Sequence, residues 1–188
     1  KVSGTVVDVR VREGQVVKKG DVLFTIDPTA FRIAVENAKA QLAQATLTID
    51  SMKQDYRRML SDIAAQQSQM RLAQATFDRA ATLIKSGATT AAVYDQARFA
   101  LNSAQSQNQS LNEQAKVLLT KLGGNPDAPA TEHPSYLQAK AQLDEAQRQF
   151  DHTVILAPFD GIATQVDHLQ PGQYLAAAAA RSVVCPEA

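Results

Sequence analysis

The side chains that most often carry catalysis or bind metal are few and scattered in this chain of 188 residues. Its three histidines, His133, His152 and His168, stand on different segments without a second His or Cys at metal-ligand spacing. The single cysteine, Cys185, lacks a spacing typical of a nucleophile and a partner for an intramolecular disulfide. The sequence also lacks a glycine-rich phosphate loop and a paired-carboxylate motif. We therefore expect no catalytic residue, no metal site and no cofactor.

The charge and the composition of the chain exclude further classes of function. Lys plus Arg and Asp plus Glu number 19 each, so no overall field attracts nucleic acid or an anionic membrane. No run of 18 or more apolar residues is present, and Lys1 is followed at once by a strand-like pattern rather than by a signal peptide. With 32 Ala, 20 Gln and no Trp, the composition favours long, thin helices over a thick core. Either a soluble protein or a fragment of a larger one is expected.

Glycine and proline divide the chain into segments of different structure. Residues 1–27 carry three glycines within valine-rich alternation, which predicts short strands and tight turns. Residues 29–122 contain no proline and a single glycine, so this stretch is expected to be mostly helix. Breakers return in 123–134, and β alternation resumes at residue 153. We therefore expect a split β domain, 1–27 plus 153–188, around a helical insert, 28–152.

Local signals mark where the helices begin. Asp27 supplies an N-cap carboxylate, and Pro28 suits the first helical position because its missing N–H is no loss there. After the break, Ser135 and Gln138 fit a capping box, so a shorter helix is expected to restart at Ser135.

The helical insert repeats apolar residues in alternating steps of four and three. In the first helix, fifteen of the sixteen positions of this heptad seam are apolar, as in a coiled coil. The first seam consists of Phe31, Val35, Ala38, Leu42, Ala45, Ile49, Met52, Tyr56, Met59, Ile63, Gln66, Met70, Ala73, Phe77, Ala80 and Ile84. The second consists of Tyr94, Ala97, Leu101, Ala104, Asn108, Leu111, Ala115, Leu118 and Leu122. Two helices packed along these seams are predicted.

Only Ser86-Gly87-Ala88-Thr89 can reverse the chain between the seams, so an antiparallel hairpin with its tip near 86–90 is expected. In that register the numbers of facing residues sum to about 175, which places the two polar exceptions, Gln66 and Asn108, in one layer. Their side-chain amides are expected to satisfy each other and to fix the register.

An antiparallel hairpin returns its ends to one place, so the two β segments are expected to meet there. They also look like halves of a repeat. Gly4-Thr5-Val6-Val7 with Glu13-Gly14-Gln15-Val16 matches Gly161-Ile162-Ala163-Thr164 with Pro171-Gly172-Gln173-Tyr174. Glycine turns duplicated at this distance are the pattern of lipoyl and biotinyl carrier domains, whose halves form a flattened β-sandwich.

A lipoyl-like domain split by a long helical hairpin resembles the HlyD-type membrane fusion proteins, or periplasmic adaptors, over essentially the whole chain. The break after the second seam is more similar to the EmrA-type subgroup, which serves major-facilitator exporters. The fold class that this resemblance implies is α+β, with a coiled-coil hairpin inserted between the halves of a lipoyl-like β-sandwich.

Near the hairpin tip, the family's channel-docking motif is an Arg, a Leu four residues on and a Ser eleven residues on, followed by a Tyr-Asp pair. Here Arg79, Leu83, Thr90 and Tyr94-Asp95 fall at those offsets, with Thr in place of Ser. The resemblance therefore implies that Arg79, Leu83 and Thr90 dock onto an outer-membrane channel.

The resemblance further implies a non-enzymatic adaptor in the periplasm of a Gram-negative bacterium, working in multidrug efflux. Its partners would be an inner-membrane exporter, of major-facilitator or ABC type, and a TolC-type outer-membrane channel. The adaptor would associate as a trimer or hexamer, with no cofactor and no nucleic-acid partner. The family's membrane anchor and β-barrel domain are not in this sequence, so membrane attachment would depend on that absent anchor.

Three other interpretations stay open. The nearest is an HlyD-like adaptor of an ABC exporter in type I secretion. A lipoyl or biotinyl carrier would need a modified lysine between the halves, where Ile26-Asp27-Pro28 stands instead; Lys18 and Lys19 lie earlier, near the Gly20 turn. The third is a plain coiled-coil scaffold. The Ala176–Ala180 run stands where the repeat predicts a strand, and the sequence does not explain it.

Overall fold

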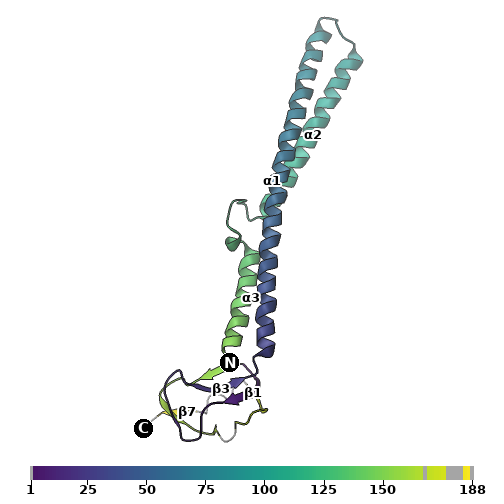
Figure 1. Cartoon of the computed structure of the whole chain (residues 1–188). Coiled ribbons are helices and arrows are strands. Elements are labelled where there is room, and N and C mark those ends of the chain that lie inside the picture. The colour runs from purple at the N-terminus through teal and green to yellow at the C-terminus, as the bar shows by residue number, and fades with distance from the viewer. Residues whose placement is uncertain (1, 167–168, 177–183, 187–188) are drawn as a thin grey trace. The chain divides into compact units, whose positions relative to one another are not determined.

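The structure is a computed structural model of the chain, and its fold is α+β, as the sequence predicts (Figure 1). The described residues are 2–166, 169–176 and 184–186. His168 and residues 177–180 of the alanine run lie outside them. The chain divides into two compact units: a β unit of residues 1–45 and 135–188, and a hairpin unit of residues 46–134.

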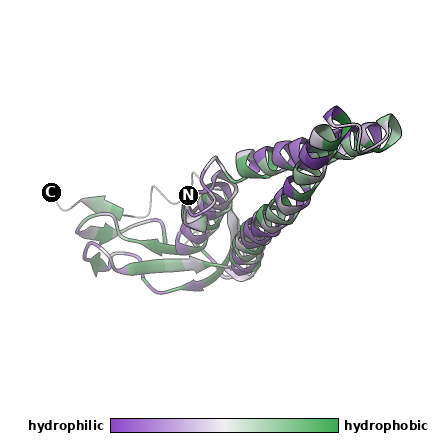
Figure 2. Cartoon of the chain, turned by 90° about the horizontal axis from the view of Figure 1, so that it is seen from above, coloured by the Kyte–Doolittle hydropathy of each residue, from purple (hydrophilic) through white to green (hydrophobic). Residues whose placement is uncertain are grey.

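Helix α1 spans Thr29–Lys85 and α2 spans Ala91–Lys121. Helix α2 and the part of α1 from residue 46 onward form the hairpin unit, and their predicted seams are its interior. Every seam position from Ile49 to Ile84 and from Tyr94 to Leu122 is buried or half-buried. Hydrophobic and hydrophilic residues alternate along both helices in Figure 2, as expected when one stripe of each helix is buried. The heptad prediction is therefore confirmed.

The hairpin reverses through a helix-ending turn centred on Gly87. The Gly87 N–H donates to the Ile84 carbonyl at 3.2 Å, and the Ala88 N–H donates to the Leu83 carbonyl at 2.9 Å. This pair of bonds is the Schellman motif, which needs a residue in the left-handed region, and Gly87 has a φ of +72°. The single glycine of the helical stretch is thus the residue that stops α1.

The start of α1 differs slightly from expectation. The helix begins at Thr29, and the Pro28 carbonyl accepts its first hydrogen bond, from the Arg32 N–H at 2.8 Å. Asp27 accepts from the Thr29 N–H at 2.9 Å. Hydrogen bonds from the Thr29 hydroxyl and backbone N–H lower the pKa of Asp27 below its ordinary value. Asp27 therefore caps the helix as predicted, but Pro28 precedes the first helical residue.

The break after α2 is a loop held at several points. It contains a short 3-10 helix, η1, at Ala130–Glu132. The Lys53 ammonium donates to the Ala128 carbonyl, and the His133 ring Nε2 donates to the Lys121 carbonyl at 2.9 Å. Helix α3 then runs from Pro134 to Asp151. It starts one residue before the predicted Ser135 because proline is favoured at the first helical position.

The β unit contains two antiparallel sheets, and each combines strands from both ends of the chain. One sheet has the order β4-β3-β1-β6, and the other has the order β2-β5-β7. The strands are β1 Gly4–Val9, β2 Val16–Val17, β3 Val22–Ile26, β4 Val154–Leu156, β5 Gly161–Ala163, β6 Tyr174–Leu175 and β7 Val184–Pro186. Their shared core includes Val6, Leu23, Phe24 and Ala163. The two distant segments therefore meet in one core, as predicted.

The predicted repeat is visible in the backbone pairing between the two halves. Four backbone hydrogen bonds form two equivalent pairs. In the first pair, the Gly14 N–H donates to the Ala163 carbonyl at 2.9 Å, and the Gly172 N–H donates to the Val6 carbonyl at 2.8 Å. In the second pair, the Ala163 N–H donates to the Gln15 carbonyl and the Val6 N–H donates to the Gln173 carbonyl, both at 2.8 Å. Val6 and Ala163 hold matching places in the repeat and are 1% and 0% exposed. Each half thus supplies the partners that complete the other.

Within the described part of the chain, none of the helices combines the length and the hydropathy that crossing a lipid bilayer requires.

The sheet of β2, β5 and β7 can be tested at Gly161. A Cβ at this position would meet the backbone carbonyl of Cys185, whereas a Cβ at Gly4 would meet the Cγ2 methyl group of the Ile26 side chain. A carbonyl held in a sheet cannot turn aside as a side chain can. We expect Gly161→Ala to lower the free energy of unfolding by about 1–3 kcal/mol, and Gly4→Ala by less, in urea denaturation. Equal losses would contradict the pairing of β5 with β7.

Candidate docking site at the hairpin tip

Arg79 and Leu83 lie one turn apart on α1 and line the same groove between the two helices. The groove has a volume of about 440 Å³. Its other lining residues are Thr76 and Ala80 from α1, Thr89 before α2, and Val93, Gln96, Ala97 and Ala100 from α2. The floor consists of small side chains, since Ala80 and Ala97 are 6% and 7% exposed. The site is therefore a shallow groove that a partner side chain can enter.

The apolar edges of this groove come from both helices. Leu83 is 46% exposed and Val93 is 49% exposed. Each stands directly beside a seam residue, Leu83 before Ile84 and Val93 before Tyr94. The sequence interpretation selected Leu83 and missed Val93. The signal that could have identified Val93 is an apolar residue next to the seam within one turn of the reversal.

Arg79 is the cation of the groove, and its side chain is exposed. Among the described residues its recorded polar partner is the Thr76 hydroxyl, at a long 3.4 Å from Nη2. Arg58 and Arg98, by contrast, form ion pairs with Asp55 and Asp95 on their own helices. A guanidinium has five N–H donors in a planar fork, so most of the donors of Arg79 can still bind a partner.

Thr90 begins α2 and is exposed, but it is not part of the groove lining. Its Oγ1 accepts a hydrogen bond from the Val93 N–H at 3.4 Å, and its backbone is extended, as an N-cap requires. The hydroxyl proton remains able to donate to a partner. The structure thus gives Thr90 a capping role next to the groove that Arg79 and Leu83 share.

The Tyr-Asp pair that follows has partners within the hairpin. The Tyr94 ring lies 5.5 Å from the Phe77 ring at a tilted 40° angle, which closes the seam near its end. Asp95 forms an ion pair with Arg98 at 3.2 Å. These contacts hold the end of the hairpin that carries the groove.

The predicted polar layer differs from expectation. The Gln66 amide donates to the Ala104 backbone carbonyl at 3.3 Å, one turn before Asn108. The Asn108 side-chain oxygen is buried and has no hydrogen-bond partner among the described residues. The amides of Gln66 and Asn108 therefore do not satisfy each other. Because Ala104 has only a methyl side chain, its carbonyl is accessible to the long Gln66 side chain and competes with the Asn108 amide.

The remaining candidates from the sequence lie outside this site. Cys185 is exposed on β7, with its sulfur 3.6 Å from the Thr164 hydroxyl. His133 lies in the loop before α3, and His152 follows the end of α3. In the ranges that the structure describes, no three His, Cys, Asp or Glu residues come together as metal ligands.

The family model described as "RND MFP, barrel-sandwich hybrid domain" matches residues 1–186, which include both the β unit and the hairpin. This chain belongs to the membrane fusion proteins. Proteins of this family are adaptors rather than enzymes.

Two relatives resemble this membrane fusion protein along nearly all of its sequence. It is 30% identical over 191 residues to the multidrug export protein EmrA of Escherichia coli (strain K12), covering 99% of this chain and 47% of EmrA. It is also 30% identical over 183 residues to the fatty acid resistance protein FarA of Neisseria gonorrhoeae, covering 97% of this chain and 46% of FarA. The chain therefore spans about half the length of the curated relatives it matches.

A solved structure shares the fold. The crystal structure of MacA from Actinobacillus actinomycetemcomitans matches with a TM-score of 0.53 and 23% identity, covering 100% of this chain and 47% of that one. The combination of a helical hairpin and antiparallel sheets is thus a fold that MacA has too.

The unsatisfied oxygen of Asn108 leads to a stability prediction. Asn108→Leu is expected to raise the free energy of unfolding by about 1–3 kcal/mol, because it removes a buried acceptor without a partner. Asn102→Leu, on the exposed surface of α2, is the control and is expected to change stability little. Urea denaturation measures both. A less stable Asn108→Leu protein would contradict the destabilising role assigned to this oxygen.

The capping role of Thr90 can be separated from docking. Thr90→Ala removes the acceptor of the Val93 N–H and is expected to lower the free energy of unfolding by about 0.5–1 kcal/mol. Thr90→Ser keeps the hydroxyl, and its stability is expected to match the parent protein. Thermal unfolding followed by circular dichroism provides the comparison. Identical unfolding of both variants would rule out the cap.

Proposed function

We propose that this membrane fusion protein is a non-enzymatic periplasmic adaptor that links an inner-membrane exporter to a TolC-type outer-membrane channel in multidrug efflux. The names of two relatives support this role, because EmrA is a multidrug export protein and FarA is a fatty acid resistance protein. The family match, which extends over both the β unit and the hairpin, also supports it. In this proposal the lipoyl-like domain comprises 1–27 plus 153–188 and the hairpin comprises 28–152.

Docking to the outer-membrane channel is assigned to the hairpin tip. The observation that carries this assignment is the exposed Arg79 guanidinium beside the apolar groove edges Leu83 and Val93. A guanidinium can fork onto carbonyl or carboxylate oxygens at the end of a partner helix. Leu83 and Val93 then bury apolar surface against the same helix, and the Thr90 hydroxyl donates a further hydrogen bond. Charge and apolar contact act together at one groove.

The exporter is assigned to the major-facilitator type, with an ABC exporter as the alternative. The long break between α2 and α3, together with the similarity to EmrA, favours the first. The genes that neighbour the gene of this protein would distinguish the two exporter types. A neighbouring gene for a major-facilitator exporter would support the first type, and one for an ABC exporter would support the second. The adaptor is proposed to be anchored to the inner membrane and to associate as a trimer or hexamer, so that hairpins placed side by side form the wall of a conduit.

Charge reversal at the tip tests the docking role. Arg79→Asp in the full-length protein is expected to abolish resistance in cells that lack the native gene, because it places an anion where the partner's oxygens bind. The readout is growth in compounds to which the gene's deletion sensitises the cells. Arg71→Asp, also exposed on α1 but outside the groove, is the matched control and is expected to preserve resistance.

Expression and folding are measured for both variants. The unfolding midpoint of the chain is expected to be unchanged by Arg79→Asp, since that side chain is exposed and forms no recorded ion pair within the described residues. Full resistance in Arg79→Asp cells with normal expression would refute docking through this residue.

A further inference from the structure

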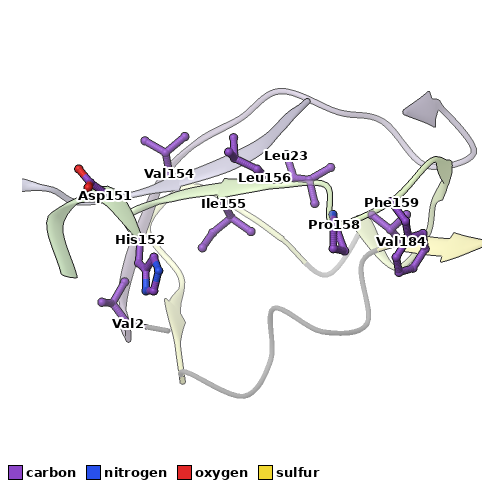
Figure 3. Close-up of a pocket in the computed structure, with 10 residues that line it drawn as sticks. All are labelled: Val2, Leu23, Asp151, His152, Val154, Ile155, Leu156, Pro158, Phe159 and Val184. Atoms are coloured by element: carbon purple, nitrogen blue, oxygen red, sulfur yellow. The ribbon is translucent and has the colours of Figure 1, made fainter. Parts of the chain in front are cut away.

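The β unit has a cavity of its own, with a volume of about 700 Å³. Apolar side chains from β3, β4 and the loop after β4 form most of its wall, among them Leu23, Ile155, Leu156, Pro158 and Phe159 (Figure 3). Leu156 is 49% exposed and Phe159 is 40% exposed, so the wall is accessible from solvent. Small-molecule sites in proteins are typically apolar hollows of about 300–1,000 Å³ with a few polar groups. The cavity has the size and the lining of such a site.

One end of this cavity is polar and acidic. Asp151 and His152 lie at that end, opposite Phe159 (Figure 3). Asp151 is the last residue of α3, where the helix dipole is negative and disfavours an anionic side chain. The carboxylate and the helix end therefore combine their negative potential at one place on the cavity wall.

The protein supplies little positive charge to offset that end. The recorded partner of Asp151 is the neutral Gln147 amide, which donates to Oδ1 at 2.8 Å. The nearest cation in sequence, Arg148, is held by Glu145 on the same helix. Within the described residues, no ion pair includes Asp151. Asp151 is exposed to solvent, and its carboxylate can attract a cation bound beside it.

We propose that this cavity binds a lipophilic organic cation, with its apolar body against Leu156 and Phe159 and its positive charge toward Asp151. Apolar burial provides most of the affinity, and the acidic end selects the sign of the charge. This binding is a second activity, separate from docking at the hairpin tip. It is measurable on the chain alone, so its failure leaves the adaptor proposal untouched, and the reverse also holds.

The test uses two probes of the same shape and opposite charge. Tetraphenylphosphonium and tetraphenylborate are titrated into the chain by equilibrium dialysis at pH 8. We expect the cation to bind saturably with one site per chain, and more tightly than the anion. Added salt is expected to weaken only the binding of the cation.

Substitutions at the acidic end and at the apolar end of the cavity test whether the cation contacts both. Asp151→Asn is expected to raise the Kd for tetraphenylphosphonium by roughly two- to fivefold. Asp144→Asn lies on the same helix, pairs with Lys140 and serves as the matched control. Phe159→Ala is expected to raise the Kd by about three- to tenfold, because apolar contact is lost. Tyr174→Ala, at an exposed aromatic residue outside the cavity, is expected to leave the Kd unchanged.

Several results would overturn this proposal. Equal affinity for the two probes would remove the role of Asp151, and binding insensitive to Phe159→Ala would place the ligand elsewhere. Absence of cation binding in a chain that self-associates in sedimentation would identify the cavity as a surface between copies. The tip variant Arg79→Asp is expected to bind the cation normally, and loss of binding there would also contradict the assignment.

Discussion

The pairing of the two chain ends in one small β unit is the interaction on which the rest of the protein depends. Neither end can bury a sheet alone, because each supplies only a few short strands. The backbone bonds between Val6, Gln173 and Gly172 are matched by those between Ala163, Gln15 and Gly14, so each half completes the hydrogen bonds of the other. This mutual completion lets a long helical insert interrupt the domain while the buried backbone groups of Val6 and Ala163 keep their hydrogen bonds.

In the helical hairpin, each helix buries one stripe of side chains, and this packing determines which residues near the tip remain exposed. Seam residues such as Phe77, Tyr94 and Ala97 pack between the two helices. The residues beside the seam are left to face solvent, and near the reversal these are Leu83 and Val93. The Schellman turn at Gly87 and the cap at Thr90 end one helix and begin the next within a few residues. A well-defined groove beside Arg79 is the result.

The two polar residues of the otherwise apolar seams, Gln66 and Asn108, are accommodated in different ways. Gln66 finds a backbone carbonyl rather than the amide of Asn108, whose side-chain oxygen stays buried and unpaired within the described residues. A long, flexible amide can reach several acceptors, so sequence register alone does not select among them. The β unit shows the complementary case, because Asp151 and the end of α3 place negative charge beside an apolar cavity.

Periodicity by itself determined the long-range organisation of this protein. The heptad seams, the single glycine at the reversal and the duplicated glycine turns predict the hairpin, its tip and the union of the chain ends, because each depends on backbone geometry repeated along the chain. Tertiary structure alone decided which side chains meet. It placed Val93 beside Leu83, moved the Gln66 bond to Ala104 and opened the cavity at Asp151, since these contacts join residues that no local pattern relates. Repeated spacing specifies elements, whereas packing between elements selects the surfaces that can bind a partner.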